Sequence, residues 1–322
     1  MEAFIDLEQR IKTWFADYEV YIMPVIRFFV MLAVLLLMNW HLGYRLLLMR
    51  WVLVILVSLV CALLPWSGMT ALAGIYLLGH VSALSWEAAV VLGVLMFIAV
   101  LLHYLFLPGA SFLIVIVPLA YYLRIPYLVP LLAGLFGGGL AFIPTGLGVA
   151  MYYMMNGLER NAQIFLDPAR SIQEQFLTAI GILRSSRAMV VAVAAFCLVT
   201  LAVYGIRKLS IDYVKYMAVA AGAILMLVVH IVGSMLMDLT LSYMTVLIGC
   251  VISALIAVLI VLWCGQVDYS RPEYLQFEDD EYIYYVKAVP KIVLERPEKE
   301  LMTISGRDRA KEKERPAGGP AE

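Results

Sequence analysis

The chain has 322 residues, of which 64% are hydrophobic and 15% are charged, and its formal net charge at pH 7 is -1. Soluble proteins carry about 25% charged residues, so the apolar area of this chain exceeds what one globular core can bury. This composition excludes an ordinary soluble domain. The charges are segregated along the chain and form no basic face, so we expect no nucleic acid partner. We predict an all-α polytopic bundle of transmembrane helices, with the lipid bilayer as a partner.

Residues 1–20 are predicted to form an amphipathic helix at the membrane interface. Leu7, Ile11 and Trp14 fall on one helical stripe, and charged residues fill the other positions. The acidic residues Glu2 and Asp6 stand where a cleavable signal peptide would have basic ones. We therefore expect the first hydrophobic segment to be retained.

About nine apolar segments within 21–264 are long enough to be considered as membrane spans. We expect the third and fifth, of about 15 residues each, to be tilted, re-entrant or partly buried by neighbours, because a full crossing takes about 20 residues. The segments are 21–40, 46–65, 69–84, 87–107, 110–123, 127–156, 188–206, 214–236 and 241–264.

The number of passes depends on the sixth segment. Nine passes place the basic residues of the 207–215 loop, Arg45, Arg50 and Arg124 in the cytoplasm together, with the C-terminal tail. A tenth pass arises if the sixth segment reverses at its triple glycine. We favour nine passes in a cytoplasmic membrane, because ten would move Arg45, Arg50 and Arg124 outside together.

The loop at about 167–186 is predicted to contain a helix that lies flat on the membrane surface. Asp167 is a suitable N-cap, Pro168 suits the first helical position, and apolar residues repeat at helical spacing after them. This helix is either a lid over the preceding segment or a plain connection.

The central segment 127–156 is the strongest candidate for a functional site. It belongs to a charge-free run from Ile125 to Leu158 that glycines and prolines interrupt. Irregular backbone at membrane depth persists only where it is buried in protein or lines a wet cavity. The alternative is that the glycines only allow close helix packing. The residues predicted to line a path or pocket are Gly134, Gly137, Gly138, Gly139, Pro144, Thr145 and Gly146.

Ionisable groups inside spans form a second group of candidates, because each is costly in lipid unless it is paired or hydrated. Histidine can relay protons near physiological pH, but it also occurs as a hydrogen-bonded packing residue. We find no carboxylate in the middle of a span, which argues against proton-coupled transport. The intramembrane polar residues are His80, His103, His230 and Asp238.

Motifs of known enzymes are missing from the sequence. It contains no HExxH, GxSxG, P-loop or dinucleotide-binding pattern, and its four cysteines form no CxxC pair. We therefore predict no catalytic residue, no cofactor and no metal site.

Residues 265–295 are predicted to be a cytoplasmic β-type docking segment, followed by a disordered tail at 296–322. Alternating aromatic and β-branched residues favour a strand at 282–287, and a second short strand is predicted at 291–295. One or two strands cannot bury a core, so we expect the segment to pair with the cytoplasmic face of the membrane domain, a second copy of the chain or a partner protein. The docking residues are Glu278, Asp279, Asp280, Tyr282, Tyr284, Tyr285 and Lys287.

Three segments resemble an uncharacterised family of polytopic membrane proteins from clostridia-like Firmicutes, loosely labelled permease-like. They are Ser210-Ile211-Asp212-Tyr213, Val267-Asp268-Tyr269-Ser270-Arg271 and the tail motif QFEDDEYIYYVKAVPK at 276–291. The resemblance implies a Gram-positive cytoplasmic membrane and a cytoplasmic tail. It supplies no catalytic or binding residue.

Two functions are compatible with these observations. The first is a transport-type, permease-like membrane component in which 127–156 lines a path and the tail docks a partner. The alternative is a non-transporting scaffold or assembly factor that recruits partners through the 276–291 motif.

Overall fold

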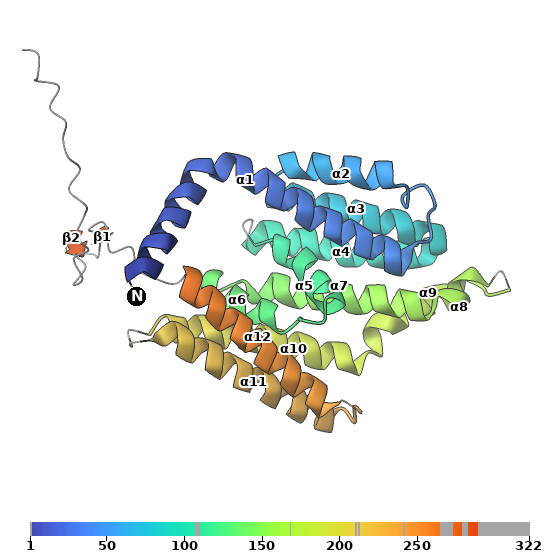
Figure 1. Cartoon of the computed structure of the whole chain (residues 1–322). Helices are drawn as coiled ribbons and strands as arrows, with labels where there is room; N and C mark the ends of the chain where they lie inside the picture. The colour runs from blue at the N-terminus through green and yellow to red at the C-terminus, as the bar shows by residue number, and fades with distance from the viewer. Residues whose placement is uncertain are drawn as a thin grey trace, which may run out of the picture. The chain divides into compact units, whose positions relative to one another are not determined.

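The computed structural model describes residues 2–106, 110–167, 169–209, 211, 213–240, 242–264, 273–278 and 283–288. The chain forms two compact units, Met1–Gln266 and Val267–Glu322. The described part of the first unit is helical (Figure 1), and apolar helices in it are compatible with an integral membrane protein. Its helices are α1 (Glu2–Leu42), α2 (Trp51–Leu63), α3 (Trp66–Leu84), α4 (Trp86–Phe106), α5 (Phe112–Tyr122), α6 (Leu128–Phe136), α7 (Phe142–Arg160), α8 (Ala162–Leu166), α9 (Ile172–Arg184), α10 (Arg187–Arg207), α11 (Val214–Leu236) and α12 (Tyr243–Cys264).

Five helices of the described chain are long and apolar enough to cross a membrane, where the sequence suggested about nine segments. These five are α3, α10, α11, α12 and the Tyr18–Leu42 part of α1. The third segment was expected to be short, yet α3 has 19 residues. The second is the short one, because α2 has only 13 residues and begins at Trp51 instead of 46. The fifth is short as predicted, with 11 residues in α5.

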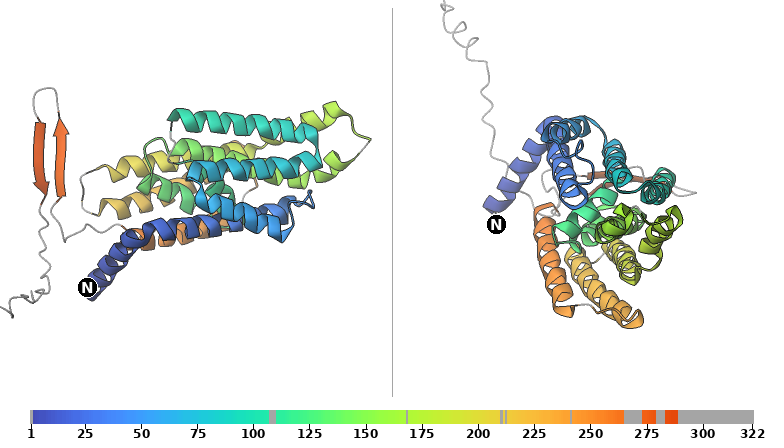
Figure 2. Two further views of the ribbon diagram at one scale, coloured as in Figure 1. Left: turned by 90° about the horizontal axis from the view of Figure 1, so that it is seen from above. Right: turned by 90° about the vertical axis from the view of Figure 1, so that its right-hand side faces the viewer.

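The N-terminal amphipathic segment and the first span form one continuous helix. α1 runs for 41 residues from Glu2 to Leu42 and contains Pro24. A proline inside a helix removes one backbone hydrogen bond and bends the helix. α1 is accordingly bent, with an N-terminal arm that leaves the line of the following residues (Figures 1 and 2).

The central segment is a helical hairpin that reverses between α6 and α7, at residues 137–141. Arg207, at the end of α10, donates a hydrogen bond to the carbonyl of Leu135 near the end of α6. After the reversal, Gly139 faces Tyr204 and Gly146 faces Cys197, so α7 returns along α10 toward its start. α6 has only nine residues and is about 14 Å long, too short for a crossing of about 30 Å.

Two hydrophobic clusters form the core of the first unit. One joins α1 to α4 with α7 and α9, and the other joins α6, α7 and α10 with α11 and α12. α5 and α7 contribute to both clusters; on α7, Met151 belongs to the first and Val149 to the second. These two helices therefore connect the two halves of the bundle (Figure 2).

The surface helix predicted at 167–186 is present as α9, but it begins later. Its N-cap is Ser171, whose hydroxyl accepts from the Glu174 amide while the Glu174 carboxylate accepts from the Ser171 amide. The prediction of Asp167 as N-cap is wrong, because Asp167 instead ends α8. Leu177 on α9 is exposed, whereas Ala179 and Ile182 are buried and face α4 and α7, so its apolar outer face is free to contact lipid.

The described part of the second unit is a two-stranded antiparallel hairpin. β1 (Glu273–Glu278) pairs with β2 (Ile283–Ala288), with Gln276 opposite Tyr285. The strand expected at 291–295 lies outside the described residues, as does the tail at 296–322.

Candidate functional site

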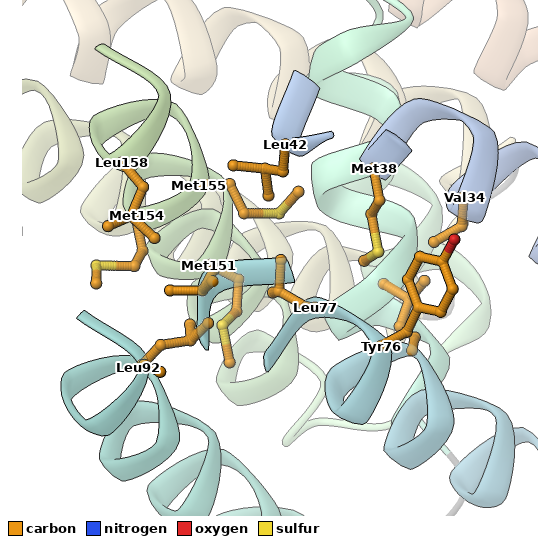
Figure 3. Close-up of a cluster of buried hydrophobic side chains, with 14 of the residues drawn as sticks. Val34, Met38, Leu42, Tyr76, Leu77, Leu92, Met151, Met154, Met155 and Leu158 are labelled. Carbon is orange, nitrogen blue, oxygen red and sulfur yellow. The ribbon is translucent and has the colours of Figure 1, made fainter. Parts of the chain in front are cut away.

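A cavity of about 160 Å³ lies in the first half of the bundle, between α1, α3, α4, α5 and α7. We call it the five-helix cavity. Its wall is largely apolar, and flexible methionines contribute from α1, α4 and α7. Figure 3 shows Met38 from α1, Leu77 from α3 and Met151 and Met155 from α7 in the cluster that forms part of this wall.

Two hydroxyl groups in the cavity wall are buried without a hydrogen-bond partner in the described chain. They are Ser111 Oγ, next to the start of α5, and Tyr122 Oη, at its end. An unpaired buried hydroxyl costs about 1 to 3 kcal/mol. Both residues line the cavity, and both oxygens are covered by neighbouring atoms.

The wall also contains a break in the backbone hydrogen bonding of α5. Pro118 lies inside the helix and has no N–H to donate to the carbonyl of Ile114, four residues earlier. Both residues line the cavity. The Ile114 carbonyl therefore lacks the donor that position 118 supplies in an ordinary helix.

The two ends of the cavity carry opposite charges nearby. At one end, Arg27 donates to the Leu64 carbonyl at 3.0 Å and lies over the ring of Trp66, at 5.5 Å from its centroid. At the other end, the ring of Tyr122 stacks on His41 at 4.0 Å, and His41 Nδ1 lies 3.1 Å from a carboxylate oxygen of Glu159. The charged groups therefore flank an apolar interior.

Beside the cavity, His80 belongs to a buried network that connects α1 with α3. His80 Nε2 and the Tyr76 hydroxyl each lie 2.8 Å from Asn39 Oδ1. His80 Nδ1 faces the amide of Arg45 at 3.5 Å. Both ring nitrogens are thus engaged, so His80 serves as a hydrogen-bonded packing residue.

The glycines of the predicted path mostly face side chains of neighbouring helices. A Cβ added at Gly134 would lie 2.7 Å from Val203 Cβ, one at Gly139 would lie 2.9 Å from the Tyr204 ring, and one at Gly146 would lie 2.9 Å from Cys197 Sγ. At Gly137 an added Cβ would meet the Ala133 carbonyl oxygen at 2.3 Å. Close packing against α10 explains Gly134, Gly139 and Gly146, while Gly138 is exposed.

The glycines and prolines of the sequence suggested a segment interrupted in its middle. Pro144, however, does not break a helix. It lies in the first turn of α7, where backbone N–H groups have no intrahelical acceptor and proline is tolerated. The hydroxyl of the buried Thr145 donates to the Ala141 carbonyl, and both groups are thereby satisfied.

The remaining intramembrane candidates are not gathered into one site. His230 Nδ1 bonds the Met226 carbonyl of its own helix at 2.9 Å, and its ring packs edge-on against Tyr127. Asp238 is exposed beyond the end of α11, with a φ of 50° that ends the helix. His103 lies on α4, and its side chain is outside the described residues.

Some of the predicted docking residues lie on the β1–β2 hairpin, and the others lie outside the described residues. Glu278 ends β1, and Tyr284, Tyr285 and Lys287 lie on β2. Asp279, Asp280 and Tyr282 lie outside the described residues.

Sequence reasoning missed the five-helix cavity. Its polar residues include Ser111 and Tyr122, which belong to no recognisable motif. Pro118 inside a predicted span was the available signal. Comparison with protein-family models, with curated proteins and with solved structures returns no match.

Proposed function

We propose that the chain is a transport-type component of the cell membrane that binds an apolar or amphiphilic molecule in the five-helix cavity. The single observation that carries this proposal is an apolar cavity with two unpaired buried hydroxyls, Ser111 Oγ and Tyr122 Oη. Ligand sites are mostly apolar concavities with a few polar groups that fix orientation. The path is thus assigned to the first half of the bundle instead of the glycines at 134–146.

The size of the cavity supports a role in binding. A cavity of about 150 Å³ accommodates benzene. The five-helix cavity therefore holds a ring or a short stretch of alkyl chain, and Met96, Met151 and Met155 adapt to its shape.

The elements around the cavity support movement of the bound molecule. α5 is short, contains Pro118 and forms one wall, and it is followed by the re-entrant α6. Discontinuous helices of this kind form the substrate sites of many transporters. A molecule from the bilayer would enter between helices.

The scaffold function remains the second candidate, and two observations favour it. Gly134, Gly139 and Gly146 allow close packing against α10, which is compatible with a scaffold. The β1–β2 hairpin has only two strands in the described chain, and such a hairpin is marginally stable until it binds another element.

Binding is tested by bromine quenching of tryptophan fluorescence with the full chain in zwitterionic lipid nanodiscs. Bromo-octanol, a neutral probe, is expected to give saturable quenching beyond that of its lipid partitioning. Ala99→Phe fills the cavity from α4 and should abolish the saturable part, whereas Ala220→Phe, at an exposed position on α11, should keep it. Equal quenching in both variants would refute the cavity as a binding site.

Complementation of a strain that lacks the gene separates transport from scaffolding. A transport-type component loses function with Ala99→Phe and keeps at least part of it without residues 273–288. If removal of 273–288 abolishes function and Ala99→Phe does not, the scaffold function holds.

A further inference from the structure

Arg27 is a cation near one end of the five-helix cavity. Among the described residues, no carboxylate oxygen lies within 4.0 Å of its guanidinium. Its Nε is buried and has no hydrogen-bond partner there. One of its donors, Nη1, is occupied by the Leu64 carbonyl at the end of α2.

Arg27 is aligned with the cavity along α1. With 3.6 residues per turn, Arg27, Val34 and Met38 fall on the same helical face, and Val34 and Met38 line the cavity. The rise along the helix places Arg27 about 10 Å beyond Val34. The guanidinium therefore lies past one end of the apolar interior, on the side that faces it.

Trp66 connects Arg27 with the unpaired hydroxyl of Ser111. The guanidinium lies over the Trp66 ring, which in turn lies 5.4 Å from the ring of Phe112. The next residue after Trp66 is Ser67 and the residue before Phe112 is Ser111, and both serines line the cavity. A cation and an orphaned hydroxyl thus flank the same end.

From this arrangement we propose that the five-helix cavity takes an anionic amphiphile, with a carboxylate or phosphate between Arg27 and Ser111 and an alkyl chain in the cavity. This inference rests on the proposed binding function. The anion would neutralise a charge that is costly at membrane depth, and it would accept from donors that are now unpaired. The alkyl chain would replace empty space next to Met151 and Met155.

The opposite end of the cavity fixes the direction of the amphiphile. The Glu159 carboxylate lies beside His41, whose ring covers Tyr122. A second anion there would be repelled by Glu159, so the head group binds at the Arg27 end. The terminal methyl group then points toward Tyr122.

The test uses octanoate with bromine either next to the carboxylate or at the terminal carbon, in zwitterionic nanodiscs. Bromine next to the carboxylate should quench Trp66 more strongly than terminal bromine, and Trp66→Phe should remove that difference. Stronger quenching of Trp66 by terminal bromine would overturn the proposed direction.

Arg27→Gln should weaken octanoate binding at least tenfold and leave bromo-octanol binding unchanged, since a hydrogen bond to a charged group contributes enough for a factor of that size. Arg27→Lys should restore part of the affinity. Arg50→Gln, at an exposed arginine before α2, is the matched control and should change neither. Melting temperatures of the four proteins show whether each is folded.

The two proposals fail separately in this design. If Arg27→Gln weakens the binding of octanoate and of bromo-octanol equally, or changes the binding of neither, the anionic head group is refuted while the cavity remains a binding site. If Ala99→Phe leaves the binding of both probes intact, the cavity itself is refuted. Phosphatidylglycerol in the nanodisc distinguishes two sources of the anion. If it competes with octanoate, the ligand is a lipid head group, and if it does not compete, the ligand is a free carboxylate. Both outcomes support an anionic ligand.

Discussion

Asn39 on α1 and His80 on α3 are joined by a hydrogen bond of 2.8 Å between Oδ1 and Nε2, in the interior of the bundle. The same Oδ1 lies 2.8 Å from the hydroxyl of Tyr76, which also lies 2.7 Å from the Leu48 carbonyl. His80 Nε2 therefore carries the proton and donates, and Nδ1 accepts from the Arg45 amide. Through Tyr76 and His80, α3 holds the 43–50 loop against the end of α1.

Removing Asn39 should destabilise the protein more than its size suggests. Asn39→Ala takes the acceptor from His80 Nε2, and an orphaned buried donor costs about 1 to 3 kcal/mol, whereas the Tyr76 hydroxyl can still donate to the Leu48 carbonyl. A double-mutant cycle with His80→Ala, followed by denaturation in detergent, should give a coupling energy of about 1 kcal/mol or more. A cycle of Asn39→Ala with His230→Ala, whose ring bonds its own helix, should show none. Coupling in both cycles, or in neither, would contradict the network.

The glycines that face α10 should not tolerate even a methyl group. Gly134→Ala places a Cβ at 2.7 Å from Val203 Cβ, and overpacking of this kind costs about 1 to 3 kcal/mol. Gly181→Ala on α9 meets nothing within 4 Å and should stabilise its helix by about 0.5 to 1 kcal/mol. Thermal unfolding of the two variants in one detergent measures the difference. Equal melting temperatures would mean that α6 and α10 are less closely packed than described.

The unpaired hydroxyls should show a conflict between stability and binding. Tyr122→Phe and Ser111→Ala each remove a buried polar group without a partner, and so should stabilise the unliganded protein by up to about 1 kcal/mol. Ser111→Ala should also weaken octanoate binding, since it removes a donor at the head group. Loss of stability in Ser111→Ala would show that its hydroxyl has a partner within the fold.

The start of α9 depends on the capping box at Ser171. Ser171→Ala removes a side-chain acceptor from the Glu174 amide and should destabilise the helix by about 1 kcal/mol. Hydrogen exchange of the amides in the first turn of α9 should accelerate several-fold. The control is Thr178→Ala, because the Thr178 hydroxyl bonds the Glu174 carbonyl within the helix and caps nothing.

The sequence predicts α10 and α11 to within one residue at each end. The segment 214–236 coincides with α11, and 188–206 is one residue shorter than α10 at each end. α10 carries no charged residue between Arg187 and Arg207, and α11 lies between Asp212 and Asp238, so local composition defines their ends. The start of α2 was placed at 46 because Leu46 and Leu47 are apolar, and tertiary bonds from Tyr76 and His80 to the preceding loop set the real boundary.

The candidate site was much less accessible to sequence reasoning. The five-helix cavity combines residues of α1, α3, α4, α5 and α7 that are distant in the chain and ordinary in composition. A cavity is a property of how side chains fit together, which periodicity does not encode. The glycines at 134–146 are unusual in the local sequence, but the reason for Gly134, Gly139 and Gly146 is the close approach of α10.

The reversal at residues 137–141 has a consequence for the two termini of the helical unit. α6 and α7 run in opposite directions, and the Cys264 end of α12 lies at the same end of this unit as the N-terminal arm of α1 (Figures 1 and 2). Compartment-sensitive reporters fused before α1 and after α12 should therefore give matching signals. A fusion in the 43–50 loop should give the opposite one.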